Sequence, residues 1–318
     1  MKAAVVAGPG QPPRYQDFVD PPTDSNGHWI LSVTAAALTP VAKVMASGGH
    51  YASGGTAAFV AGLDGVGTSP SGQRMYFARG QAPFGAFAER VLVERDNCIP
   101  IPDGVADVTA AAIANPGLSS VAALLSRAHF TRGETVLIHG ATGAAGMLAV
   151  VLARRLGARR IIATGRNSDA LQRLRELGAD AVVELGEPDG GMAALTHEFA
   201  TGGVDVILDY IYGTPSDVVI AAIAGAAKGV RPIRYCVIGG VGSADAKVSS
   251  NWLRSAPVTL MGSGMGSLLW SDFLAATKVV FDEAAATALD IPTTTVPLSE
   301  IGEIWDGPGT GNRIVFTP

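Results

Sequence analysis

TVLIHGATGAAG, the sequence of residues 135–146, indicates the fold of this chain. A short apolar run at 136–139 ends in a glycine, and small residues then lead directly into a helical pattern. Ala141, Gly143 and Gly146 stand in an A-x-G-x-x-G spacing, in which small residues let backbone amides approach a phosphate at a helix N-terminus. The stretch therefore predicts a strand, a tight turn and a helix start that together hold a phosphate.

The residues that follow the motif strengthen this interpretation. Gly157 is of the type that commonly ends a helix, and Arg154 and Arg155 place positive charge in the last turn, where it suits the carbonyl end of the helix dipole. A second apolar run at 161–164 follows at the distance that a βαβ unit requires. The apolar residues between the motif and this run recur at helical spacing: Met147, Leu148, Val150, Val151, Leu152 and Leu156.

The end of the second strand bears on the choice between NAD and NADP. A site that prefers NAD usually places an Asp or Glu there to bind the ribose 2′-hydroxyl. This chain has Gly165, Arg166 and Asn167 instead. Arg166 can pair with a 2′-phosphate, and no carboxylate follows the strand to repel it, so the sequence predicts NADP(H). An ordinary exposed arginine is the alternative interpretation of Arg166.

Composition limits the classes of protein to consider. A chain of 318 residues with 48% hydrophobic and 16% charged residues can form two domains with large cores. The net charge is -5 and the basic residues are scattered, so nucleic acid is not an expected partner. The N-terminus lacks the hydrophobic region of a signal peptide, and no apolar run is expected to reach transmembrane length. With only Cys98 and Cys236, no disulfide framework is expected, and a cytoplasmic protein without a membrane partner is predicted.

Alternating patterns extend beyond the motif. Strand-like runs separated by helical segments, such as 217–228, predict a parallel doubly wound sheet. Residues 1 to about 110 contain short strand-like pieces at 3–6, 29–33 and 87–93, broken by Gly and Pro, and are expected to be mostly β. A long helix is expected at 271–288 and a last strand at 313–316. The strands expected in the second half lie at 181–185, 205–210, 235–240 and 258–262.

Several segments together resemble a known family: AALTPVAK at 36–43, GLDGVGT at 62–68, FGAFAERVLV at 84–93, LGADAVVEL at 177–185, DYIYG at 209–213 and LRSAPVTLMGSG at 253–264. With the phosphate motif, they are similar to the medium-chain dehydrogenase/reductase superfamily, in its zinc-free quinone oxidoreductase-like, or zeta-crystallin-like, branch. The resemblance implies an α/β fold. A Rossmann doubly wound parallel sheet would form an NADP-binding domain at 116–288, and a GroES-like β-rich catalytic domain at 1–115 would be completed by 289–318.

Zinc is the first question that the resemblance raises, because related alcohol dehydrogenases bind it through Cys and His. Two isolated cysteines cannot supply a four-cysteine structural site. Cys98 lies in a loop-like stretch, and Cys236 lies in an apolar run, where a small buried hydrophobic residue is the better interpretation. Where the zinc enzymes place a cysteine, this chain has Thr39 and Pro40. We therefore expect no metal in the reaction.

Without a Lewis acid, the resemblance implies that NADPH delivers hydride to a quinone or to an α,β-unsaturated carbonyl compound, while the protein positions the reactants and donates a hydrogen bond. Tyr51 is the first candidate donor, because a phenol stays protonated at neutral pH. Thr39 and Lys43 come next. The family commonly has Asn at the position of Thr39 and Asp at that of Ala42, so this chain departs from the pattern twice in one loop.

The expected cofactor contacts follow from the motif and the resemblance. In many relatives a Tyr after the third strand contacts the cofactor, whereas Leu185 and Gly186 stand here. The residues expected to contact NADP(H) are Ser119, Ala141, Thr142, Gly143, Ala144, Ala145, Gly146, Gly165, Arg166, Asn167, Tyr212, Ile238 and Gly239.

The sequence excludes one other class of function and leaves a second one open. A short-chain reductase needs Tyr and Lys four residues apart on a helix, and no tyrosine in this chain has Lys at that spacing. A non-catalytic NADPH-binding redox sensor or structural protein stays open, because a fold does not fix a function. The resemblance also implies a homodimer, in which the strand at 258–262 pairs with its copy.

Overall fold

The apolar run that opens the quoted stretch becomes β9 (Thr135–His139), a fully buried interior strand of a six-stranded sheet. In this computed structural model, β9 pairs in parallel with β10 (Arg160–Gly165) on one side and with β12 (Val206–Asp209) on the other. The strand order is β11-β10-β9-β12-β13-β14, and every pairing is parallel. The order reverses between β9 and β12, which is the point where doubly wound sheets bind ligands.

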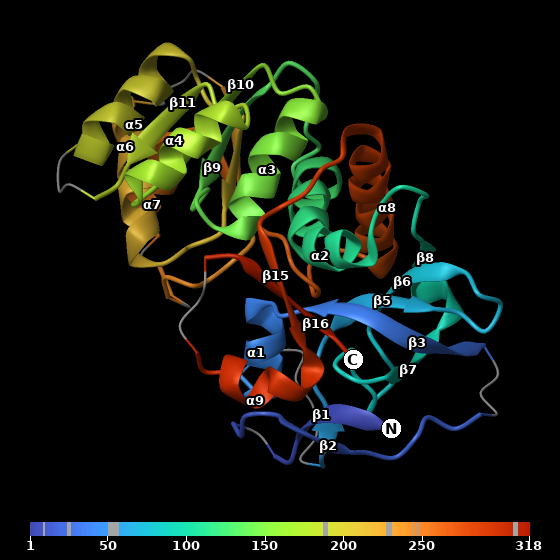
Figure 1. Ribbon diagram of the computed structural model, residues 1–318. Helices are drawn as coiled ribbons and strands as arrows, with labels where there is room; N and C mark the ends of the chain where they lie inside the picture. The colour runs from blue at the N-terminus through green and yellow to red at the C-terminus, as the bar shows by residue number, and fades with distance from the viewer. Residues whose placement is uncertain are drawn as a thin grey trace. The chain divides into compact units, whose positions relative to one another are not determined.

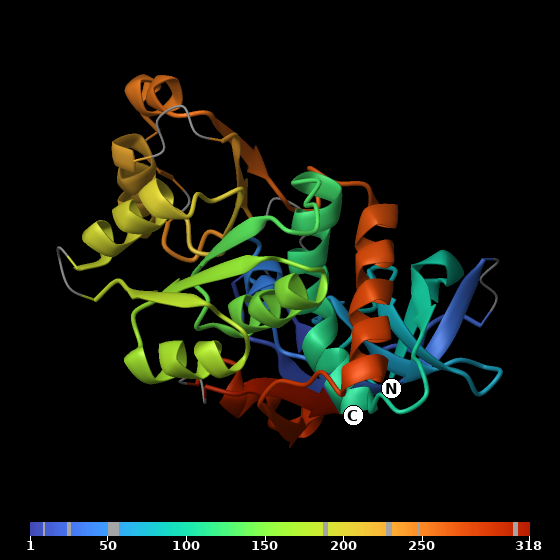
Figure 2. The ribbon, with the colours of Figure 1, turned by 90° about the horizontal axis from the view of Figure 1, so that it is seen from above.

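The structure describes residues 1–8, 10–23, 27–49, 57–186, 190–226, 231–243, 245–246, 248–307 and 311–318. The chain divides into two units, Met1–Asn115 with Phe281–Pro318 and Pro116–Val280. Both junctions fall within helices, α2 (Asp107–Ala122) and α8 (Trp270–Thr287), the second of which is unbroken in Figure 2. The sequence pattern predicts the second junction later, after residue 288.

Strands and helices alternate through the second unit, and Figure 1 labels this alternation from β9 to α5. The structure ends the strand predicted at 235–240 early, so that Ile238 and Gly239 lie in the loop that follows it. The remaining elements are α3 (Ala144–Arg155), α4 (Ser168–Glu176), β11 (Ala181–Glu184), α5 (Gly190–Thr201), α6 (Asp217–Ala226), β13 (Ile233–Val237), α7 (Ser250–Ser255) and β14 (Val258–Gly262).

Each face of the parallel sheet has its own apolar core. Ile138 of β9 and Ile161 of β10 belong to a core that includes residues of α3 and α4. Their neighbours Leu137 and Ile162 belong to a second core, which includes residues of α5, α6 and α7. Successive side chains of a strand point to opposite faces, so helices cover both faces of the sheet. This arrangement confirms the predicted doubly wound Rossmann fold.

The helices α3 and α4 end with the same backbone geometry. Gly157 follows α3 with φ +97°, and Gly178 follows α4 with φ +114°, in the left-handed region that favours glycine. The residue after each glycine donates its N–H to the carbonyl five residues earlier, at 2.9 and 2.8 Å. These bonds form the Schellman motif, which satisfies carbonyls at a helix end. The predicted helix end at Gly157 is confirmed.

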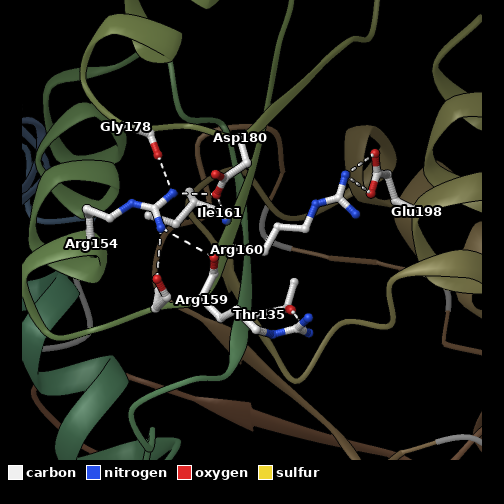
Figure 3. Close-up of polar contacts among 9 residues, drawn as sticks. Thr135, Arg154, Arg159, Arg160, Ile161, Gly178, Asp180 and Glu198 are labelled. Atoms are coloured by element: carbon white, nitrogen blue, oxygen red, sulfur yellow. Dashed lines mark hydrogen bonds and ion pairs between the residues drawn. The ribbon is translucent and has the colours of Figure 1, made fainter.

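Arg154 connects the two helix ends, as Figure 3 shows. Its Nη1 donates to the carbonyl of Ala158 at 2.9 Å, and its Nη2 donates to the carbonyl of Gly178 at 2.8 Å. Nη2 also forms an ion pair with Asp180, whose carboxylate accepts the N–H of Ile161 at 2.7 Å. The arginine thus binds specific carbonyls and a carboxylate, beyond the general dipole effect inferred from the sequence.

We predict that Arg154→Ala lowers the free energy of unfolding by about 1–3 kcal/mol, because the helix-end carbonyls and Asp180 lose their common donor. Arg155→Ala is the matched control, since Arg155 is exposed at the end of the same helix. It should change stability by no more than about 0.5 kcal/mol. Urea denaturation of both variants measures the difference; equal losses would contradict the role given to Arg154.

The first unit is rich in β-structure, as expected. Its three-stranded sheet has the order β2-β1-β4, and its seven-stranded sheet has the order β15-β16-β3-β5-β6-β8 with β7 paired to β3. Cys98 begins a strand rather than lying in a loop. The elements are β1 (Lys2–Val6), β2 (Arg14–Asp17), β3 (His28–Ala37), α1 (Pro40–Ala46), β4 (Phe59–Val60), β5 (Asp64–Thr68), β6 (Arg74–Ala78), β7 (Arg90–Glu94), β8 (Cys98–Pro100), β15 (Thr293–Pro297), α9 (Ile301–Ile304) and β16 (Arg313–Thr317).

The expectation that no apolar segment reaches transmembrane length was wrong. Asp107–Arg127, which comprises α2 and the π-helical turn Ala123–Arg127, is long and apolar enough to cross a membrane by length and composition alone. Of its most apolar window, 72% is buried inside the protein. A core helix passes the same length and composition test, so the segment gives only weak support for a membrane span.

Candidate functional site

The turn between β9 and α3 is held by the ends of two neighbouring strands. Gly140 has φ +85°, and Ala141 donates its N–H to the carbonyl of Thr164, near the end of β10, at 2.9 Å. A methyl group added at Gly140 would lie 2.6 Å from Cγ1 of Ile211, in the loop after β12. Glycine is therefore required at this position for both conformation and space.

Gly146 sets how closely α3 approaches this turn. A methyl group added at Gly146 would lie 2.6 Å from the Gly140 carbonyl oxygen and would overlap the backbone of Ala141. Only a residue without a side chain permits this contact, which is the packing role of the last glycine in a dinucleotide fingerprint. The first turn of α3 consequently lies directly against the end of β9.

The N-terminus of α3 is free to bind an anion. Gly143 is its N-cap, makes no side-chain capping bond, and is followed by a first turn without acidic residues. The nearest heavy atom to a methyl group added at Gly143 would be the Gly140 carbonyl oxygen at 4.0 Å, so space is open there. In α1 and α4, by contrast, Thr39 and Asn167 cap the helix with their side chains. The amides of 144–146 and the helix dipole are thus a candidate site for an anion.

We predict that Gly146→Ala lowers the free energy of unfolding by about 2–3 kcal/mol, because the new methyl group displaces α3 from the turn. Gly225→Ala is the matched control, since Gly225 is exposed in α6 and a methyl group there would meet nothing within 4 Å. It should raise stability by about 0.5–1 kcal/mol. Thermal and urea denaturation measure both, and a stabilising Gly146→Ala would contradict the close approach.

The end of β10 borders the same turn. A methyl group at Gly165 would overlap Cγ2 of Thr142, so the turn packs directly on this strand end. Arg166 is exposed, and within the described ranges its side chain makes neither an ion pair nor a hydrogen bond. The Oδ1 atom of Asn167 accepts the N–H of Ala170 at 2.8 Å. Asn167 therefore caps the N-terminus of α4, and its predicted cofactor contact stays a prediction.

A carboxylate lies beside this strand end, contrary to the sequence expectation. Glu184, the last residue of β11, pairs in register with Gly165 of β10. The hydroxyl of Ser168, the first residue of α4, donates to Oε1 of Glu184 at 2.8 Å. The expectation considered only the residues that follow β10 in the chain, whereas the parallel pairing brings this carboxylate from the next strand.

Asp209, at the end of β12, organises the loop that follows it. Its buried carboxylate accepts the N–H groups of Ile211 at 2.8 Å and Tyr212 at 2.9 Å through Oδ1. Its Oδ2 accepts the hydroxyls of Ser216 and Tyr235, both at 2.7 Å. These four bonds compensate for burying a charge. The DYIYG motif did not by itself indicate this role for its aspartate.

Asp209 also joins the ends of β12 and β13. Its carbonyl accepts the N–H of Ile238 at 2.8 Å and that of Gly239 at 3.2 Å. A methyl group at Gly239 would overlap the carbonyl oxygen of Tyr210, so glycine is required. Tyr212 has φ +53° in the same loop. The structure thus places these three predicted residues at the carboxyl edge of the parallel sheet, the edge where the phosphate turn lies.

Ser119 and its neighbour lie near the start of α3. The hydroxyl of Ser119 donates to the carbonyl of Pro116 at 2.9 Å. Ser120, which sequence reasoning missed, lies 2.7 Å from the Tyr210 hydroxyl and 3.5 Å from the Ala145 carbonyl, hydroxyl oxygen to oxygen. Burial raises the pKa of Tyr210 above its ordinary value, so this phenol stays protonated. The pair links α2 to the loop after β12.

The predicted catalytic residues belong to the first unit. The buried Thr39 hydroxyl accepts the N–H of Ala42 at 3.1 Å and so caps α1. The Lys43 ammonium donates to the carbonyl of Trp305, and lies 5.8 Å from the centre of its ring. Tyr51 lies outside the described residues. The roles of all three therefore stay predictions.

In the part of the chain that the structure describes, the two cysteines do not fit a zinc site. Burial raises the pKa of both Cys98 and Cys236 to about 12, whereas zinc binds the thiolate. The two thiols also belong to different units. Among the described residues, no group of three His, Cys, Asp or Glu side chains could hold a metal ion.

Comparisons with known proteins agree with this geometry. The family model described as zinc-binding dehydrogenase matches residues 144–282. That segment contains one cysteine, Cys236, and one histidine, His197. A probable NADPH-dependent quinone reductase of Emericella nidulans is 28% identical, and the alignment covers 100% of both chains.

Two solved structures share the fold over the whole chain. A probable oxidoreductase of Mycobacterium abscessus has a TM-score of 0.78 at 26% identity, covering 100% of this chain and 97% of that one. The quinone oxidoreductase of Thermus thermophilus, which was also solved in complex with NADPH, has a TM-score of 0.80 at 24% identity and covers 100% of both chains.

Proposed function

We propose that this chain, which belongs to the medium-chain dehydrogenase/reductase superfamily and to its quinone oxidoreductase-like branch, is an NADPH-dependent oxidoreductase that acts without zinc. Its substrate would be a quinone or an α,β-unsaturated carbonyl compound. The chemistry that NADPH supplies is a hydride, delivered to a carbon that is already electrophilic.

The observation that carries this proposal is the uncapped start of α3 at the switch point of the sheet. Gly140 and Gly146 hold the helix against the end of β9, and Gly143 leaves open space in front of its amides. A pyrophosphate would bind there. Arg166, exposed at the end of β10, would pair with the 2′-phosphate of NADPH.

The other predicted contacts surround this turn. Tyr212, Ile238 and Gly239 lie on the loops after β12 and β13, and Ser119 lies on α2. In the proposal, residues of the second unit bind the cofactor, and a hydrogen-bond donor, for which Tyr51 is the first candidate, acts on the substrate oxygen. Such a donor stabilises the negative charge that develops as hydride arrives.

Independence from zinc is supported by the chemistry of the two thiols, which burial keeps protonated. A reaction that starts from a quinone or an enone does not need a Lewis acid, because conjugation already makes the acceptor carbon electrophilic. We further propose a cytoplasmic protein with a small-molecule substrate, without nucleic-acid or membrane partners.

We also propose a homodimer. In the described part of the chain, β14 has a strand partner on one side only and ends the parallel sheet. Its side chains are half-buried or exposed. Pairing with β14 of a second copy would satisfy the backbone groups of this edge. Arg127 donates to the carbonyl of Gly262 at 2.7 Å and so fixes the strand's last residue.

Steady-state oxidation of NADPH with a panel of quinones, enones and aldehydes tests the proposed activity. Arg166→Ala should raise the KM for NADPH about tenfold and change the KM for NADH less than about twofold, because only NADPH has the 2′-phosphate. Arg173→Ala, which removes an exposed charge near the other end of α4, is the control. Equal effects of Arg166→Ala on both cofactors would contradict the role of Arg166.

Tyr51 is the proposed donor to the substrate oxygen. Tyr51→Phe should reduce kcat by about 10²-fold while leaving the Kd for NADPH unchanged, because the phenol would act only in the transition state. Single-turnover kinetics with NADPH in excess measure the chemical step. An unchanged rate would remove Tyr51 from the mechanism and leave Thr39 as the next candidate.

A non-catalytic NADPH-binding redox sensor is the second candidate. It is favoured by the use of Thr39 as a helix cap and by the bond from Lys43 to the Trp305 carbonyl, since both groups already have partners within their own unit. Tight NADPH binding without turnover of any acceptor in the panel would favour this candidate over the oxidoreductase.

A further inference from the structure

We propose that Glu184 sets the dinucleotide preference of the site by opposing the 2′-phosphate of NADPH and by accepting a hydrogen bond from the ribose 2′-hydroxyl of NADH. The chain would therefore bind both dinucleotides. Its Kd values for NADPH and NADH would differ less than they would if Arg166 acted without Glu184. This inference rests on the proposed dinucleotide site, but not on catalytic turnover.

The sheet places Glu184 beside the predicted 2′-phosphate position. Glu184 ends β11 and pairs in register with Gly165, the residue just before Arg166. The next residue, Leu185, donates its N–H to the Gly165 carbonyl at 2.8 Å, so the two strand ends remain paired up to the carboxyl edge. In open α/β sheets this edge is where ligands bind.

Ser168 fixes the direction of the Glu184 side chain. Its hydroxyl donates to Oε1 of Glu184 at 2.8 Å, and it is the first residue of α4. Only Arg166 and Asn167 separate Gly165 from Ser168. The bond therefore directs the carboxylate toward the β10–α4 loop, whose arginine would contact the same part of the cofactor.

The charges of Arg166 and Glu184 do not neutralise each other. Arg166 and Glu184 are both exposed, and no ion pair joins them in the described part of the chain. The Glu184 carboxylate is bound by a neutral hydroxyl instead. Both charges can therefore act on a ligand, and they act in opposite senses.

The opposite effects of Arg166 and Glu184 on a ligand differ between NADPH and NADH. A 2′-phosphate has a charge of roughly −1.5 to −2 at neutral pH, so Arg166 attracts it and Glu184 repels it. The ribose 2′-hydroxyl of NADH is neutral and can donate to a carboxylate, as it does to the acidic residue of sites that prefer NAD. Here that acidic residue comes from the third strand of the sheet rather than the second.

Glu184→Gln tests the inference, because it removes the charge and keeps the size of the side chain. Isothermal titration calorimetry of the full chain with NADPH and with NADH gives the ratio of the two Kd values. We expect the variant to favour NADPH over NADH by roughly three- to tenfold more than the unmodified chain does. The gain should shrink in 1 M salt, where the Debye length falls to about 3 Å.

Glu176→Gln is the matched control. Glu176 is an exposed glutamate at the opposite end of α4, so its substitution changes the net charge of the protein by the same amount. It should leave the ratio of Kd values unchanged. An unchanged ratio in Glu184→Gln, or the same change in both variants, would overturn the inference and attribute any effect to net charge.

The binding measurement separates this inference from the proposed activity. If NADPH binds and Glu184→Gln shifts the ratio, but no acceptor is reduced, the inference holds and the oxidoreductase proposal fails. If acceptors are reduced and Glu184→Gln leaves the ratio unchanged, the activity stands and the inference fails. Absence of binding by either dinucleotide would overturn both.

Discussion

The contact between the first turn of α3 and the end of β9 is the constraint on which the rest of the site depends. A methyl group at Gly146 would lie 2.6 Å from the Gly140 carbonyl oxygen, so this approach exists only because residue 146 is glycine. It places the amides of residues 144–146 at the point between β9 and β12 where the strand order reverses. No side chain caps these amides. Helix dipole and free amides then favour an anion at this point.

The two edges of the parallel sheet differ in the exposure of their polar groups. At the amino edge, Asp205 accepts the N–H of Thr135 at 2.8 Å, and Asp180 does the same for Ile161 at 2.7 Å. Arg154 adds bonds to two helix ends near this edge. At the carboxyl edge, the start of α3 has no side-chain cap, and polar side chains such as Glu184 and Arg166 are exposed. Bonds fix the strand ends at the carboxyl edge as well, where the Asp209 carbonyl accepts the N–H groups of Ile238 and Gly239. The groups that would meet a ligand therefore lie on an edge that is itself held in place.

Much of the fold could be predicted from local patterns, and the site only in part. One βαβ unit could be predicted because its signals lie close together in the chain. These signals are the apolar run of β9, the small residues of the turn and Gly157 after α3. Glu184 could not be placed from the chain order, because it reaches the site through the register of β10 and β11. The four bonds to Asp209 likewise join groups from two strands and a loop. Such contacts depend on tertiary pairing, which a single sequence does not reveal.

The central claim is that the free amides at the start of α3 bind the pyrophosphate of NADPH. Titration of the ¹⁵N-labelled protein with NADPH, followed by amide correlation spectra, tests this most directly. The account predicts that the amide resonances of Ala144, Ala145 and Gly146 shift the most, because their N–H groups gain charged acceptors. Saturable NADPH binding that leaves these three resonances in place would contradict it.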